Sequence, residues 1–453
     1  MSHHFELPLD IFGQDPETAY ATPFLFLWPL QDNEGIAEIV ARLQVGLEVL
    51  VKAVPWVAGR VVWHASSSND AYPYKIVPLG PTPHVVVHDY RHALDAPSMG
   101  ELMQKKFPIG LLDESILSPV NVLPGATDEK RDAVLTIQFT RLRGGLAVNI
   151  VGNHQVLDGT GQEQLIYLLD KACRGQAFDA EEIATANLDR TTIIRPFDSY
   201  WQPPVDTMYV KPVSSGLSVK DSGVQGAKPA YAWVNWAFSK LAQMELKAIA
   251  MQQLSVDFVS TDDVLTACIW QALARARIGR LGPGVKSTMG RSVNPRRYLD
   301  IPANYPGYVA NDAFSKLSLQ EVVESPLGGV ASILRAAVHP RTSDLRNTTR
   351  EFATLLHRAA DKSTVSKGAC LDLDSDLMVS SWANMRCNHF TFEFGLGTPS
   401  AFRRPKHAIV PSLIFLLPRC DDGEVVVTMC TRVDDLSALR VDKEWARFAE
   451  YIG

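Results

Sequence analysis

The sequence predicts two α/β domains that face each other, with a ligand site at their interface. Its 453 residues exceed what one ordinary hydrophobic core supports, so two domains are expected. The stretch 203–229 is rich in Pro, Ser, Gly and Lys and has no sustained apolar period, which indicates an exposed linker. We therefore place the domains at residues 1–202 and 230–453. Ligands favour such interfaces between domains.

The first half mixes helical and strand patterns. Apolar residues recur at helical spacing from Ile36 to Val54, and Pro55 ends the pattern. Residues 133–139 and 146–151 are strand-like runs on either side of a hairpin signal, Arg143-Gly144-Gly145.

The second half shows the same mixture. Ser260-Thr261-Asp262-Asp263 resembles a capping box, and the helical pattern that follows it ends near Gly279. Residues 352–362 also have a helical pattern. Residues 413–417 and 424–431 are strand-like and flank Asp421-Asp422-Gly423, a second hairpin signal. Trp445 and Phe448 suit a closing helix.

Composition narrows the functional classes. The chain is 46% hydrophobic and 21% charged, and its 44 basic and 50 acidic residues give a net charge of −6. No basic block stands out, so neither nucleic acid nor a membrane surface is an expected partner. No signal peptide is evident at the N-terminus, and the apolar runs are too short to cross a bilayer. Six scattered cysteines are typical of a reduced, cytoplasmic protein.

The segment Asn153-His154-Gln155-Val156-Leu157-Asp158-Gly159-Thr160-Gly161 has the pattern of a strand-to-helix turn. Such a turn exposes a side chain at the end of a sheet, and histidine suits a general base because its ordinary pKa is near 6.5. The two glycines allow a sharp turn.

Asp158 has three interpretations: it orients His154, caps the next helix, or pairs with an arginine, which we favour. The spacing alone is weak evidence, because His357 and Asp361 repeat it within a helical pattern, where an exposed charge pair is expected. No third metal ligand stands at the right spacing beside His154, so no metal is expected.

The chain resembles the BAHD acyltransferases, and most closely their fungal branch, which includes the trichothecene acetyltransferases. The resemblance covers roughly residues 7–452. It rests on ordered segments in both halves: Pro55-Trp56-Val57-Ala58-Gly59-Arg60, Gly144-Gly145-Leu146-Ala147, His154-x-x-x-Asp158-Gly159, Ser260 to Trp270, Gly290 to Arg297, Val379-Ser380-Ser381-Trp382 and Glu393-Phe394-Gly395-Leu396-Gly397. The last segment departs from the family's usual Asp-Phe-Gly-Trp-Gly.

The resemblance implies a fold of two domains like chloramphenicol acetyltransferase, with a channel between them. It implies acyl-CoA as co-substrate, with acetyl as the acyl group, no permanently bound cofactor, and a hydroxylated specialised metabolite (or an amine) as acceptor. His154 would be the general base for direct attack on the thioester. Ser380 and Trp382 would donate hydrogen bonds to the oxyanion, although Trp382 could instead be a core aromatic residue.

Other residues take supporting roles by resemblance. Glu393, Gly395 and Gly397 belong to a structural motif together with Asp158 and Gly159. Arg296, and less strongly Arg291, is expected to pair with Asp158 or Glu393. Ser260 and Thr261 are expected near the pantetheine arm, and a simple helix cap is compatible with that role. The Arg403-Arg404-Pro405-Lys406 stretch is expected to be a solvated loop. The family is commonly monomeric.

Two rival functions remain. A condensation-domain-like enzyme would take its donor from a carrier protein, but it usually has a second histidine where this chain has Asn153. A non-catalytic binding protein of the same fold is the other alternative.

Overall fold

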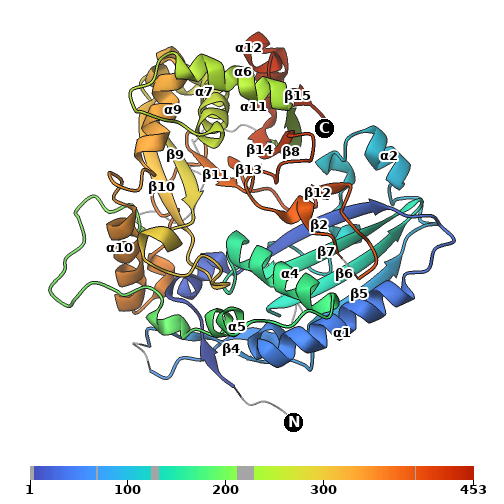
Figure 1. Ribbon diagram of the computed structural model, residues 1–453. Helices are drawn as coiled ribbons and strands as arrows, with labels where there is room; N and C mark the ends of the chain where they lie inside the picture. The colour runs from blue at the N-terminus through green and yellow to red at the C-terminus, as the bar shows by residue number, and fades with distance from the viewer. Residues whose placement is uncertain (1–4, 68–69, 124–131, 212–228, 393) are drawn as a thin grey trace.

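The computed structural model describes residues 5–67, 70–123, 132–211, 229–392 and 394–453. Two lobes form, and each is built on one large sheet with helices packed against it (Figure 1). This arrangement confirms the predicted α/β class with two lobes. Most of the predicted linker, residues 212–228, lies outside the described part.

The first lobe holds a five-stranded sheet in the order β12-β2-β7-β6-β5. Neighbouring strands in this sheet are antiparallel, except β5 and β6, which are parallel. The predicted hairpin joins β6 to β7. Every residue of β6 and β7 is buried, because the sheet is covered on both faces. The strands are β2 (Ala21–Pro29), β5 (His84–Asp89), β6 (Leu135–Leu142), β7 (Gly145–Asn153) and β12 (Ala401–Arg403).

Two helices pack together beside this sheet, α1 (Ala37–Ala53) and α4 (Gly159–Cys173). Leu43, Leu47 and Leu50 of α1 are fully buried in a hydrophobic core that also contains residues of β2. The helix ends at Ala53, two residues before Pro55, close to the end that its sequence pattern predicts.

Strand β12 comes from the second half of the chain and yet pairs with β2, with Ala401 opposite Leu27 and Arg403 opposite Leu25. The expectation of a solvated loop at Arg403 and Arg404 is therefore wrong, because their side chains are only 5% and 4% exposed. Phe402 packs edge-on against phenylalanine rings of β2, and this contact anchors the strand.

The second lobe holds a seven-stranded sheet in the order β10-β9-β11-β13-β14-β8-β15. The second predicted hairpin joins β13 to β14. The strands are β8 (Tyr231–Phe238), β9 (Lys286–Val293), β10 (Asn311–Ser318), β11 (Leu377–Ser381), β13 (Leu413–Leu416), β14 (Val425–Arg432) and β15 (Glu450–Tyr451).

Helix α7 (Thr261–Leu281) is the centre of this lobe and is buried on most of its sides, because four other helices surround it. Its predicted capping box is present: Ser260 accepts from the amide of Asp263, whose carboxylate accepts from the amide of Ser260. The surrounding helices are α6 (Lys240–Met251), α8 (Leu319–Glu324), α9 (Leu327–Ala336) and α11 (Val433–Val441). The last helix of the chain, α12 (Lys443–Ala446), contains Trp445.

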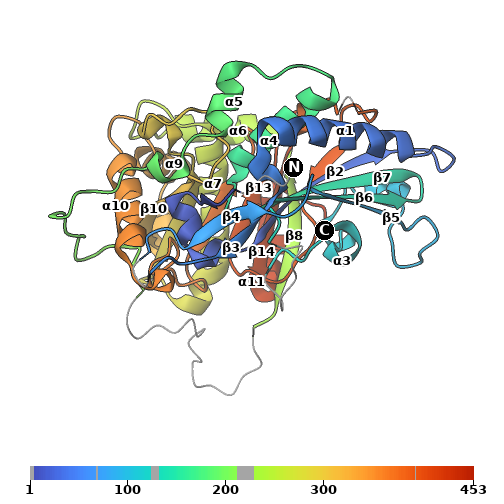
Figure 2. The ribbon, with the colours of Figure 1, turned by 90° about the horizontal axis from the view of Figure 1, so that it is seen from below.

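Some of the remaining elements lie near the junction of the lobes. Figure 2 shows the lobes side by side, with β3 and β4 near their junction. A small sheet has the order β1-β4-β3, and the short 3-10 helix η1 (Ile11–Gln14) contacts α10 of the second lobe. These elements are β1 (Leu7–Pro8), β3 (Gly59–Trp63), β4 (Tyr74–Pro78), α2 (Met99–Gln104), α3 (Glu114–Leu117), α5 (Ala180–Ala186) and α10 (Leu345–Arg358).

Helix α10 covers only part of the predicted helical stretch 352–362. It ends at Arg358, so Asp361 lies beyond the helix and accepts from the amide of Ser363 instead. No ion pair forms between His357 and Asp361 among the described contacts, and that expected charge pair is wrong. No helix in the described ranges is both long and apolar enough to cross a membrane.

Candidate active site

The predicted strand-to-helix turn is present. Strand β7 ends at Asn153 and α4 begins at Gly159, so His154 lies at the end of the sheet. Asp158 is the N-cap of α4 and accepts from the amide of Gly161 at 2.7 Å. Gly161 must lack a side chain, because a Cβ there would lie 2.1 Å from the backbone oxygen of Pro306.

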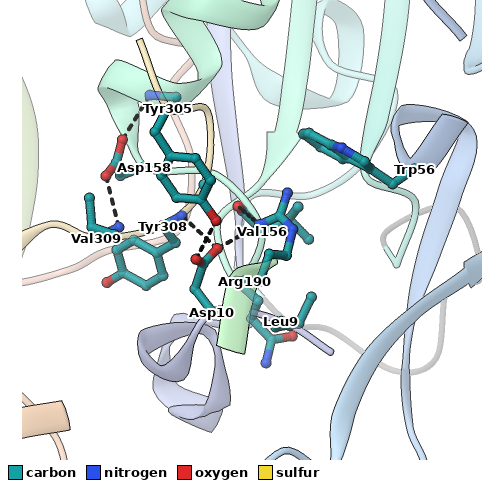
Figure 3. Close-up of polar contacts among 12 residues, drawn as sticks. Leu9, Asp10, Trp56, Val156, Asp158, Arg190, Tyr305, Tyr308 and Val309 are labelled. Atoms are coloured by element: carbon teal, nitrogen blue, oxygen red, sulfur yellow. Dashed lines mark hydrogen bonds and ion pairs between the residues drawn. The ribbon is translucent and has the colours of Figure 1, made fainter. Parts of the chain in front are cut away.

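Asp158 is buried, and neither of its carboxylate oxygens is directed to the imidazole. It accepts two hydrogen bonds from Arg296, at 2.9 and 3.1 Å. It also accepts one from the amide of Val309 at 3.0 Å (Figure 3). The capping and arginine-pairing interpretations therefore both hold. A carboxylate saturated by donors in this way is a rigid structural element.

Arg296 is held as firmly as its partner. Its guanidinium also donates to the backbone oxygens of Tyr305 and Gly307, at 3.1 and 2.8 Å. Arg291 lies elsewhere and pairs with Asp262 and Asp263 at the start of α7. The alternative partner for these arginines, Glu393, lies outside the described residues.

The imidazole of His154 lies between two tyrosine rings. The ring centroid of Tyr20 is 4.6 Å away and that of Tyr308 is 4.8 Å away. The buried Nδ1 atom has no hydrogen-bond partner among the described residues. Burial, together with the positive charge of Lys367, lowers the pKa of His154 to about 4. The imidazole is therefore neutral at physiological pH.

A cavity of about 340 Å³ opens beside this histidine and is lined from both lobes. The residues of the first half on its wall include Tyr20, His154, Asp158 and Gly159, and those of the second half include Tyr308, Asp312, Lys367, Ser380, Trp382, Arg404 and His407. The structure thus brings the predicted residues His154, Ser380 and Trp382 to one cavity.

Trp382 is a core aromatic residue, as one of its two interpretations predicts. Its ring packs against Phe24 at 4.9 Å and against Phe415 at 5.3 Å, as a core residue does. Its Nε1 atom also donates to Oγ of Ser380 at 3.1 Å. The indole N–H is therefore directed to the serine hydroxyl, which keeps its own hydrogen for another acceptor.

Arg404 is a cavity residue that the sequence did not reveal. Its guanidinium lies 4.9 Å over the ring of Trp382 and 4.2 Å over that of Phe415. Its Nε and Nη1 atoms are buried without a partner among the described residues, and burial lowers the pKa of Arg404 to about 10. Tyr20, Tyr308 and Lys367 were also missed, because no local pattern marks them.

Ser260 and Thr261 do not line this cavity. Ser260 caps α7, and Thr261 lines a second cavity of about 460 Å³ together with Lys240, Lys247 and Arg419. The two regions are linked, because the hydroxyl of Ser381, next to Ser380, donates to the carboxylate of Asp262.

The late glycine motif packs away from the cavity. Gly395 and Gly397 have φ values of +117° and +72°, a left-handed backbone that favours glycine. The backbone oxygen of Gly397 accepts from the indole of Trp28 at 3.0 Å. Neither glycine lines the cavity. Within the described ranges, no three His, Cys, Asp or Glu side chains gather closely enough to hold a metal ion.

Comparison with known proteins gives matches over nearly the whole chain. The trichothecene 3-O-acetyltransferase-like N-terminal domain matches residues 21–173, and the Transferase family matches residues 114–446. A trichothecene 3-O-acetyltransferase of Saccharomyces cerevisiae is 37% identical, covering 98% of this chain and 95% of its own. The O-acetyltransferase dmxR13 of Cryptosporiopsis sp. is 35% identical, covering 98% and 97%.

Solved structures agree. The crystal structure of F. graminearum TRI101 with coenzyme A and T-2 mycotoxin superposes with a TM-score of 0.92 at 34% identity, covering 99% of this chain and 100% of that one. Vinorine synthase shares the fold with a TM-score of 0.64 at 16% identity, covering 96% of this chain and 91% of its own. As its ordered motifs indicated, the chain belongs to the Transferase family, the BAHD-type acyltransferases.

Proposed function

We propose that the protein transfers an acetyl group from acetyl-CoA to a hydroxyl group of a specialised metabolite, with His154 as the general base. The observation that carries the proposal is the placement of a neutral imidazole on a cavity that both lobes line, beside Ser380 and Trp382. The O-acetyltransferase names of the relatives support the choice of acetyl and of a hydroxyl acceptor.

In the proposed reaction, His154 takes the proton from the acceptor hydroxyl while its oxygen attacks the thioester carbonyl carbon. The carbonyl electron pair moves to oxygen and gives a tetrahedral oxyanion. When the oxyanion collapses, the C–S bond breaks and the imidazolium returns its proton to the leaving thiolate. General catalysis of this kind contributes about 10²–10⁴-fold in rate. None of the six cysteines lines the cavity, in keeping with direct transfer.

The oxyanion needs a fixed hydrogen-bond donor. Because the indole N–H of Trp382 is donated to Ser380, we assign the direct hydrogen bond to the hydroxyl of Ser380. Trp382 would hold that hydroxyl in place and strengthen it as a donor, since hydrogen bonds in a chain polarise one another.

For the donor, we propose that the pantetheine arm passes the start of α7, near Ser260 and Thr261. The second cavity, with Lys240, Lys247 and Arg419 on its wall, would then receive the CoA phosphates. The hydrogen bond between Asp262 and Ser381 supports this route, because it joins the start of α7 to the strand that carries Ser380.

The experiment that tests the function measures thiol release from acetyl-CoA with pooled small alcohols and amines. Wild type should release CoA and give a product heavier by one acetyl group, and His154→Ala should do neither while still folding and binding CoA. Equal release by the variant would exclude His154 as the base. CoA binding without turnover in any pool would favour the non-catalytic alternative, and transfer only from a carrier-bound donor would favour the condensation-domain alternative.

The donor assignment has its own test. Lys240→Ala should raise the KM for acetyl-CoA but leave transfer from S-acetyl-N-acetylcysteamine, which lacks phosphates, unchanged. Lys105→Ala, at an exposed lysine at the end of α2, is the matched control. An unchanged KM for acetyl-CoA in Lys240→Ala would place the phosphates elsewhere.

We further propose that the protein works as a monomer in the cytoplasm, with no nucleic acid or membrane partner. The family that the chain resembles is commonly monomeric, which supports the monomer. Light scattering on the purified protein tests the assembly state.

A further inference from the structure

A second buried carboxylate lies close to the catalytic turn. Asp10, just before η1, is only 1% exposed and accepts from three donors (Figure 3). The hydroxyl of Tyr305 donates at 2.5 Å, Nη1 of Arg190 at 2.5 Å and the amide of Tyr308 at 3.0 Å. All three partners donate, and both oxygens of Asp10 accept. Burial raises the pKa of Asp10, and the positive charge of Arg190 opposes that rise.

Asp10 and Asp158 hold one segment of the second lobe between them. Tyr308 and Val309 are neighbours in the chain, and their amides donate to Asp10 and Asp158 respectively. Arg296, the partner of Asp158, donates to the backbone oxygens of Tyr305 and Gly307 in the same segment. The backbone on both sides of Tyr308 is therefore fixed by carboxylates that come from the first half of the chain.

Tyr308 is the residue of this segment that contacts the base. Its ring is 4.8 Å from that of His154, and the Nζ atom of Lys367 lies 5.1 Å from the ring centroid of Tyr308. With Tyr20 at 4.6 Å from the imidazole, the two tyrosines enclose it. The position of Tyr308 thus decides how closely His154 is covered.

Arg190 connects Asp10 to the catalytic turn itself. Its Nη1 atom donates to the backbone oxygen of Val156, two residues after His154, at 3.3 Å, and its guanidinium stacks 4.4 Å over Trp56. The segment after Asp10 also fits tightly against the turn, because a Cβ on Gly13 would lie 2.1 Å from the backbone oxygen of Gln155.

We propose that Asp10, held by Arg190, is a positioning residue of the active site: it fixes Tyr308 against His154, and so limits the access of water to the covered side of the imidazole and keeps the ring oriented. The proposal rests on the proposed function for its catalytic meaning. Its structural content, the coupling of Asp10 to the environment of His154, is independent of turnover.

The proposal predicts how His154 titrates. The charged and titratable groups around the imidazole are Tyr20 and Tyr308 at its faces and edges, and Lys367, Asp158 and Arg404 through their charges. If Tyr308 loses its anchor, more water reaches the ring, and the desolvation that lowers the pKa of His154 is reduced. The pKa of His154 should then rise toward its ordinary value.

The test compares Asp10→Asn with wild type by NMR titration of the histidine rings, with the spectrum of His154→Ala identifying the signal. We expect the midpoint of His154 to rise by about one pH unit or more, since desolvation of buried groups is worth several units. The acid limb of kcat/KM should move up by the same amount, and kcat should fall more than the KM for acetyl-CoA changes.

Asp435→Asn is the matched control, because it breaks a buried pair of the same kind, Arg277 and Asp435 at 2.9 Å, between α7 and α11. It should lower the melting temperature without moving the midpoint of His154. A midpoint in Asp10→Asn that stays at the wild-type value would overturn the proposal and leave Asp10 a purely structural residue.

Tyr305→Phe covers the case in which Asp10→Asn does not fold, because it removes only one hydroxyl from the cluster. It should raise the midpoint of His154 by a smaller amount, and no change would again overturn the proposal. The ring titration needs no substrate. Absence of transfer by wild type would therefore refute the proposed function while the result for Asp10 could still be obtained.

Discussion

Asp158 and Arg296 form a two-point ion pair, with hydrogen bonds of 2.9 and 3.1 Å, across 138 residues of chain. The pair joins the first turn of α4 to the second lobe. Asp158 makes no hydrogen bond to His154, so it acts on the imidazole through the geometry of the turn and through its charge.

Asp158→Asn should lower the stability of the fold. The substitution leaves the guanidinium of Arg296 buried without its charged partner, and breaking a buried pair from one side typically costs about 3–5 kcal/mol. Urea unfolding measures the loss. The double variant Asp158→Asn/Arg296→Met should lose less than the sum of the single variants, because the stranded charge is gone. An unchanged midpoint in the single variant would contradict the structural role.

Lys367→Met should move the acid limb of activity to higher pH. The positive charge of Lys367 disfavours the imidazolium and so lowers the pKa of His154. Without that charge the pKa rises from about 4, and activity, which needs the neutral imidazole, is lost at a higher pH as the solution is acidified. A kcat/KM profile recorded over about three pH units, from about pH 4 to just above the ordinary pKa of histidine, tests this prediction. Coincident profiles would show that Lys367 does not act on the base.

Ser380→Ala and Trp382→Phe should differ in severity. The first removes the proposed direct donor to the oxyanion, and loss of such a donor typically costs about 10²–10³-fold in kcat. The second removes only the N–H that holds Ser380 and keeps an aromatic ring in the core, so the fall in kcat should be smaller. Steady-state kinetics on both variants decide the order. The reverse order would make the indole the direct donor.

Arg404→Met should stabilise the protein, whereas Arg403→Met should destabilise it. Both arginines are buried, but Arg403 donates to the backbone oxygens of Lys106, Phe107 and Phe402, and Arg404 makes no hydrogen bond to a described residue. Replacing buried ionic groups by well-packed apolar side chains is often neutral or stabilising by about 1–4 kcal/mol. Calorimetric melting of the two variants is the measurement.

If Arg404→Met melts below wild type, the stacking on Trp382 and Phe415 outweighs the cost of the buried charge. That outcome would make Arg404 a structural residue of the cavity wall.

Several features could be predicted from the sequence because their hydrogen bonds close within a few residues. The capping box at Ser260 joins residues three apart, and the N-cap at Asp158 reaches the amide of Gly161, also three residues on. The hairpins and the turn that carries His154 are equally local. Turn and cap preferences are properties of short segments, so the sequence displays them directly.

The tertiary structure decided everything that depends on distant partners. Whether Arg296 pairs with Asp158, whether Arg404 is buried, and whether Asp10 reaches Tyr308 all depend on how the two lobes pack. A charged side chain that becomes buried must find hydrogen-bond donors or acceptors in place of water. Those partners can come from any distance along the sequence, so the sequence does not display them. The sequence by itself determined the family and the strand-to-helix turn that carries His154, and only the packing of the lobes determined what surrounds His154.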